Sequence, residues 1–254
     1  MGDTPGRFAF PRAIDVSADG RTLWVIDRSA RVQRIDPETG RCLALWKMPE
    51  SELGKPVGFC VAPGRNESGR WCDELLYIAD THYHRVMVYR PPTVTRDELP
   101  PGAPLPEPVL VGQFGSYGQE PGQFILPTDV AVAYDPTSRK GAHLYVRADG
   151  GDVLAFFDGA YKLLFTFGHY GMGSQHEALD PGKVAFARPQ SLMIEEIDGQ
   201  PMLIITDSAN HRIGRFTLDG RLISWFGAPE LIGDGPGQFR FPFGLASLHD
   251  GTAL

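Results

Sequence analysis

A short motif that recurs along the chain constrains its fold more than any other feature. In each full copy a phenylalanine stands three residues before a proline, and an apolar stretch follows the proline. One weaker copy has leucine in place of phenylalanine. The copies are spaced by about 58 residues on average, which indicates a repeat protein built from one supersecondary unit. The pairs are Phe8 and Pro11, Leu53 and Pro56, Phe124 and Pro127, Phe186 and Pro189, and Phe239 and Pro242.

Each full unit contains four short apolar stretches separated by turns. β-Branched and aromatic residues dominate the stretches, and none keeps the 3.6-residue period of an amphipathic helix. In three units a dipeptide that ends in glycine precedes the fourth stretch, which indicates a tight hairpin turn. The dipeptides are Thr39-Gly40, Asp158-Gly159 and Asp219-Gly220. The expected strands are 13–16, 22–27, 31–35 and 42–46; 57–61, 75–80, 85–89 and 108–115; 129–134, 143–148, 152–157 and 162–168; 191–194, 202–207, 212–216 and 221–227; and 244–248.

Four short antiparallel strands per repeat are typical of a β-propeller blade. We therefore predict an all-β fold with a single propeller domain over residues 1–254. Residues 90–108 are rich in proline, which cannot donate to a strand ladder, so we expect an excursion between the third and fourth strands of blade two. The expected blades lie at about residues 8–47, 53–115, 121–168 and 184–227, with a partial fifth blade at about 236–254.

Composition narrows the classes of function. The 30 glycines and 22 prolines suit short strands and tight turns. The net charge of −7 repels phosphate backbones and disfavours nucleic acid as a partner. No apolar run approaches the ~18 residues of a membrane helix, and no signal-peptide pattern occurs in this chain. Its cysteines are Cys42, Cys60 and Cys72, and their spacing matches neither a disulfide framework nor a zinc motif. We therefore expect buried or unreactive thiols, and a Cys60–Cys72 disulfide is the alternative.

A second recurring signal lies at the turn between the second and third strands. An aspartate begins this turn and an arginine ends it in three blades, whereas blade three has RADGGD. A residue that recurs in several blades is expected to serve each blade's structure. The carboxylate can accept hydrogen bonds from the turn, and the guanidinium can pair with it. The structural residues predicted are Asp27, Arg31, Asp80, Arg85, Asp207 and Arg212.

These turns resemble the NHL repeat. The resemblance rests on YIADTHYHRVMVY, on ITDSANHRIGRF with its literal Asn210-His211-Arg212, and on the P-G-x-F-x-x-P segments that end at Pro127 and Pro242. It covers nearly the whole chain and implies a six-bladed propeller. NHL propellers include peptide-amidating lyases, RNA-binding domains and many bacterial proteins, and this chain looks most like the last group. Because six blades need roughly 350 residues, we expect an open arc of about four and a half blades, truncated at the C-terminus.

Binding is predicted on one face. In propellers the turns between second and third strands share a face with the blade-to-blade loops, and function concentrates on loops held by a rigid scaffold. Side chains that depart from the repeat at these turns are the candidates for a partner or ligand surface. They are Arg28, His82, Tyr83, His84, Arg147, Asp149 and His211.

The leading functional hypothesis is a non-enzymatic scaffold that binds a protein or a small ligand through this loop face. The runner-up is a metal-dependent lyase or lactonase-like hydrolase in the central channel, where Asp15 and Asp129 are the inner-strand carboxylates. A third hypothesis is an RNA-binding face. No catalytic residue, metal site or cofactor is predicted, because neither a lyase-type histidine arrangement nor a G-x-S-x-G motif occurs.

Overall fold

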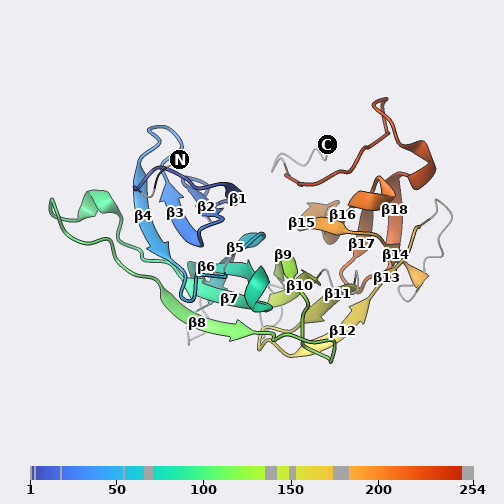
Figure 1. The fold of residues 1–254 in the computed structure, drawn as a ribbon, viewed down its shortest axis with the longest axis horizontal. Coiled ribbons are helices and arrows are strands. Elements are labelled where there is room, and N and C mark those ends of the chain that lie inside the picture. Colours follow the sequence, from blue (N-terminus) through green and yellow to red (C-terminus); the bar gives the residue numbers. More distant parts are fainter. Residues whose placement is uncertain are drawn as a thin grey trace. The chain divides into compact units, whose positions relative to one another are not determined.

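The strands form four-stranded sheets in which neighbours in sequence are neighbours in the sheet (Figure 1). We describe a computed structural model, which covers residues 2, 4–17, 19–53, 55–65, 71–134, 142–148, 153–173 and 183–247. There are four such sheets among these residues, and each is a simple meander of the kind that the repeat predicts. The only helices there are short 3-10 turns, and none is long and apolar enough to cross a membrane.

The elements follow the repeat. The first sheet contains β1 (Pro11–Val16), β2 (Leu23–Asp27), β3 (Arg31–Ile35) and β4 (Cys42–Lys47). The second contains β5 (Phe59–Arg65), β6 (Trp71–Asp80), β7 (Arg85–Arg90) and β8 (Val109–Phe114). The third contains β9 (Pro127–Tyr134), β10 (Ala142–Ala148), β11 (Val153–Phe157) and β12 (Leu163–Phe167). The fourth contains β15 (Pro189–Ile197), β16 (Gln200–Asp207), β17 (Arg212–Thr217) and β18 (Leu222–Gly227). A short parallel pair, β13 (His169–Tyr170) and β14 (Ala185–Phe186), lies between the third and fourth sheets in sequence.

The outer half of every sheet carries the same irregularity. The ladder between the third and fourth strands shifts register near the end of the third strand. A bulge at this point increases the right-handed twist of the outer strands. The shifts fall between Arg34 and Ile35, Val88 and Tyr89, Phe156 and Phe157, and Arg215 and Phe216.

The chain divides into two compact units, Met1–Pro127 and Thr128–Leu254, and each contains two sheets with an apolar core. In the first unit, Trp24 of β2 and Leu76 of β6 are fully buried in one cluster. In the second unit, Phe186 and Phe216 are fully buried, with their ring centroids 5.8 Å apart. Burial of such large side chains is the dominant favourable term in holding neighbouring blades together.

The proline-rich excursion lies between β7 and β8, as the sequence predicts. It contains a 3-10 turn, η2 (Arg96–Glu98), that contacts β4, and Asp97 forms an ion pair with Arg41 beside that strand. An outer strand offers unpaired backbone groups to other chains. The excursion therefore covers part of the outer edge of the first sheet.

Two sequence predictions are corrected. The β5–β6 ladder places Cys60 opposite Tyr77 and Cys72 opposite Gly64. At about 3.3 Å per residue the two cysteines are roughly 13 Å apart along the ladder, too far for a disulfide. Residues 244–247, within the stretch expected as an inner strand, form no ladder, because no later strand among the described residues pairs with them.

Candidate functional site

The turn between β2 and β3 is organised by one buried carboxylate. Asp27 Oδ2 accepts hydrogen bonds from Arg31 Nη2 at 2.7 Å and from the Ala9 amide at 3.0 Å. Its Oδ1 accepts one from the Ser29 amide at 2.9 Å. Asp27 and Arg31 are both buried. The carboxylate thus fixes the turn and ties it to the chain just before β1.

The turn between β16 and β17, η4 (Ser208–Asn210), repeats this arrangement. Arg212 Nε donates to Asp207 Oδ2 at 2.9 Å, and the Ala187 amide donates to Asp207 Oδ1 at 2.7 Å. Asn210 Nδ2 also donates to the carboxylate at 2.8 Å, while the Asn210 Oδ1 accepts the Gly173 amide at 3.2 Å. Asn210 therefore joins the turn to the loop that follows β13, a contact that its place in the repeat does not reveal.

The third copy, η1 (Thr81–Tyr83), is less enclosed. Arg85 Nε donates to Asp80 Oδ2 at 2.8 Å, and Arg85 Nη2 pairs with the exposed Glu50 at 2.8 Å. Burial raises the pKa of Asp80, and it raises that of Asp207 to about 6 although Arg212 opposes the shift. Burial acts on Asp27 too, but the hydrogen bonds from Ser29, Ala9 and Arg31 outweigh it and lower the pKa of that carboxyl.

Two candidate histidines tie one repeat to the next. His84 and His211 have positive φ angles of 56° and 54°. His84 Nδ1 accepts a hydrogen bond from the Leu126 amide at 3.0 Å, and His211 Nδ1 accepts one from the Phe241 amide at 3.2 Å. Leu126 and Phe241 each precede the proline of the following repeat. These side chains therefore have a structural contact that the sequence did not reveal.

The phenylalanine of the motif makes a second blade-to-blade contact. A glycine with positive φ follows or ends the fourth strand at Gly115, Gly168 and Gly227. A Cβ atom at these glycines would lie 2.4, 2.5 and 2.6 Å, respectively, from the phenylalanine ring of the next motif. The ring thus occupies the space that any other residue's side chain would need. The rings belong to Phe124, Phe186 and Phe239.

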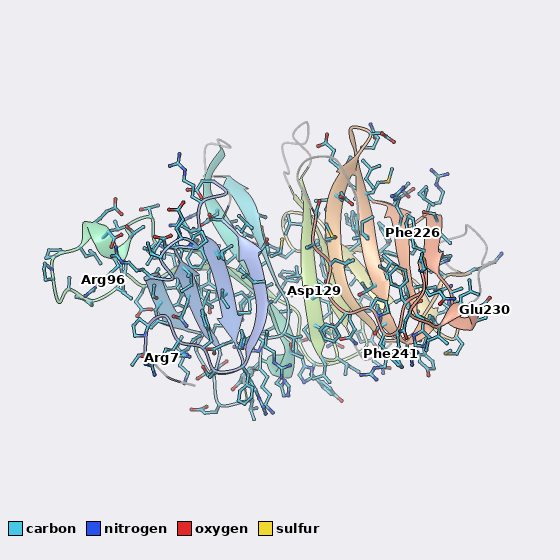
Figure 2. The ribbon with its side chains drawn as sticks, turned by 90° about the horizontal axis from the view of Figure 1, so that it is seen from above. Arg7, Arg96, Asp129, Phe226, Glu230 and Phe241 are labelled. Carbon is cyan, nitrogen blue, oxygen red and sulfur yellow. The ribbon has the colours of Figure 1, made fainter. Side chains whose placement is uncertain are left out.

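The inner-strand carboxylates of the enzymatic hypothesis bind backbone amides of the next blade. Asp15 Oδ2 accepts the Val61 amide of β5 at 2.7 Å. Asp129 lies on β9 (labelled in Figure 2), and its Oδ2 accepts the Leu192 amide of β15 at 2.9 Å. Within the described ranges, no group of three or more His, Cys, Asp or Glu side chains is placed to hold a metal ion.

Three candidate surface residues lie at the turn end of the first unit. The exposed Arg28 guanidinium lies 5.8 Å from the Phe10 ring centroid. The Tyr83 ring lies 4.9 Å from the Arg85 guanidinium, and its hydroxyl accepts the Leu53 amide at 3.4 Å. His82 is half-buried beside them in sequence. The Arg147 side chain and all of Asp149 lie outside the described residues.

Comparison with known proteins identifies the fold. No family model and no curated protein matches the sequence. Among solved structures, Chaetomium thermophilum Raptor aligns with 86% of this chain and 17% of its own, at 13% identity and a TM-score of 0.52. The fold is that of a β-propeller.

Two further propeller structures align at lower scores. The β-propeller domain of Myceliophteria thermophila Cps50 (Swd1) is 15% identical over 82% of this chain, with a TM-score of 0.48. A catalytically inactive virginiamycin B lyase from Staphylococcus aureus with quinupristin is 12% identical over 86% of this chain, with a TM-score of 0.49. The propeller described here spans 54% and 56% of those two chains, respectively.

Proposed function

We propose that this chain is a propeller of the NHL type that acts as a non-enzymatic scaffold and binds a protein or small ligand through its loop face. The observation that carries the proposal is the β2–β3 turn, where buried Asp27 and Arg31 hold the backbone while Arg28 projects into solvent. A contact residue on a fixed turn loses less conformational freedom on binding than one on a mobile loop.

The type of side chain supports the same proposal. Arginine and tyrosine are over-represented among the residues that contribute most to protein–protein binding. Arg28 is exposed, and Tyr83 is half-buried with its ring next to Arg85. In this proposal His84 and His211 contribute indirectly, since their Nδ1 atoms hold the first residues of the next repeat in place.

The assignment to the NHL type is supported by what its three signature residues do in the fourth sheet. Asn210 binds the Asp207 carboxylate and the loop after β13, His211 binds the Phe241 amide, and Arg212 pairs with Asp207. Each of the three side chains therefore has a separate structural task.

The proposal is tested by affinity capture from an extract of the source cells. The double variant Arg28→Ala and Tyr83→Ala removes the proposed contacts. The matched control Arg21→Ala and Arg221→Ala removes two exposed arginines from the hairpins at the other end of the blades. We expect at least about a tenfold loss of specific partners with the first variant and retention with the control. Equal capture by all forms would contradict the proposal.

A further inference from the structure

The turn end of the first unit combines unpaired cations with exposed apolar side chains, and we infer that it binds an acidic peptide segment. This inference rests on the proposed function, because it names the class of partner for part of the same loop face. Its elements are the cations Arg12, Arg28 and Lys55 together with the apolar side chains of Phe10 and Leu53; we call this set the basic end.

The three cations gather at one end of the sheets. Arg12 is the second residue of β1, whose first residue, Pro11, pairs with Asp27 at the end of β2, and Arg28 follows Asp27. Lys55 precedes β5, and β5 packs beside β1. No carboxylate in the described part of the chain lies within ion-pair distance of any of the three. Their charges are therefore available to a partner.

Most carboxylates at this end form ion pairs with arginines of the same chain. Asp27 is held by Arg31, and Asp80 and Glu50 are both held by Arg85. Glu52 is the exposed acid left beside the set. The hairpins at the other end of the first sheet carry the acids Asp19, Asp36 and Glu38 together with Arg21 and Arg41. Although the chain as a whole has a net charge of −7, the basic end combines three cations without an ion pair in the described part of the chain with one exposed acid.

His82 lies close enough to Lys55 and Arg12 for their charges to act on it. Its Nδ1 is buried and has no hydrogen-bond partner in the structure. Its pKa is lowered first by burial and then by the charge of Lys55, with a smaller effect from Arg12, whereas the Asp80 carboxylate opposes the shift. A histidine resists protonation where cations converge. Lys55 and Arg12 thus both act on the environment of His82.

The apolar part of the set favours a peptide over a long polyanion. Phe10 and Leu53 expose 53% and 61% of their surface. An arginine beside an exposed aromatic ring, as with Arg28 and Phe10, is typical of a protein-binding hot spot. A nucleic acid long enough to reach beyond this end would meet the acidic remainder of the chain.

The test uses fluorescence anisotropy with a fluorescein-labelled peptide in which one tyrosine is flanked by four glutamates on each side. The triple variant Arg12→Ser, Arg28→Ser and Lys55→Ser is compared with a control that carries the same change of net charge. We expect at least about tenfold weaker binding for the triple variant and less than about a twofold change for the control. Raising the salt from about 50 mM to about 150 mM should weaken wild-type binding. The control is Arg21→Ser, Lys162→Ser and Arg221→Ser.

Three results would overturn the inference: no binding of the peptide at low salt, the same loss of affinity in both triple variants, or a single-stranded oligonucleotide of equal charge that binds as tightly as the peptide. Circular dichroism verifies that both variants are folded. If the peptide fails to bind while captured partners are still lost with Arg28→Ala and Tyr83→Ala, the acidic class is wrong and the scaffold function stands. If that capture is also unaffected, both proposals fail.

Discussion

Asp27, Asp80 and Asp207 occupy the same position in three repeats, but their surroundings give them different acid–base behaviour. Each carboxylate pairs with the arginine that ends its turn. Asp207 is fully buried, and the cost of burying a charge dominates there. Asp27 is also buried, but the Ser29 hydroxyl and amide both donate to it. The same motif therefore has opposite effects on stability as the pH changes.

We expect carboxyl carbon NMR to show Asp207 half-protonated near pH 6 and Asp27 below its ordinary value of 3.8. For Asp207 the folded state keeps a proton that the unfolded state releases, so its contribution to stability falls as pH rises from 3.8 to about 6. For Asp27 the contribution is present above pH 3.8 and is lost on acidification. Titration of Asp207 below 3.8 would contradict this order.

At this scale the sequence predicted residue types better than their partners. Recurrence located the aspartates and arginines, since each copy lies within a few residues of its partner. His84 and Leu126 are 42 residues apart, and His211 and Phe241 are 30 apart, so spacing alone could not connect them. A usable signal was present: a histidine directly precedes the arginine in both copies. The departure of both histidines from the rest of the repeat favours a partner surface instead.

At the scale of the strands, the apolar pattern located all four of the four-stranded sheets in the described residues but misplaced the ends of some strands. β5 begins at Phe59 and reaches Arg65, beyond the predicted stretch of 57–61. β15 continues through Glu195 and Glu196, which pair with Met202 and Pro201 of β16. Ladder pairing with a longer neighbour extends a strand into polar residues. Hydrophobic pattern does not contain that information.

The glycines that receive the phenylalanine rings provide a prediction at the level of the blade junction. Gly227→Ala would place a Cβ atom 2.6 Å from both the His211 carbonyl oxygen and the Phe239 ring, at a φ of +78°. We expect it to lower the free energy of unfolding by about 3 kcal/mol. Gly237→Ala has a similar φ of +74° but open space around it, and should cost only about 1 kcal/mol. Urea denaturation measures both, and equal losses would contradict the junction's role.

For the whole molecule, stability is concentrated in the middle strands of each sheet. Ile26, Ile78 and Ile205 of β2, β6 and β16 are fully buried, whereas Ile14 of β1 is 62% exposed. Local opening is easiest where few apolar contacts must break. The proline-rich excursion at residues 91–108 has no strand pairing and carries several exposed side chains.

Hydrogen exchange followed by mass spectrometry should therefore separate these regions. We expect amides of β2, β6 and β16 to exchange at least about a thousandfold more slowly than those of residues 91–108, equivalent to about 4 kcal/mol of opening free energy. Peptides that contain β1 should be intermediate. Uniform exchange along the chain would show that the sheets lack this graded stability.

At the same scale the sequence predicted the β-propeller fold, and the structural comparison confirms it. The reason is redundancy: several copies of Phe-x-x-Pro and four apolar stretches per copy all indicate one unit. A partner is harder to predict, because residues such as Arg28 are not constrained by packing. Their roles depend on the partner molecule, about which this sequence contains no direct information.

Gene duplication in such a chain is constrained by where its junction contacts begin and end. A copied segment that starts at one Phe-x-x-Pro motif and stops before the next carries a phenylalanine for the glycine upstream. The segment of residues 186–238 also carries the glycine and the histidine, Gly227 and His211, that receive the repeat downstream. Such a copy is compatible with both of its neighbours when it is inserted. A copy cut between the histidine and its glycine would split this downstream junction, so lineages that gain or lose repeats should do so in whole motif-to-motif steps.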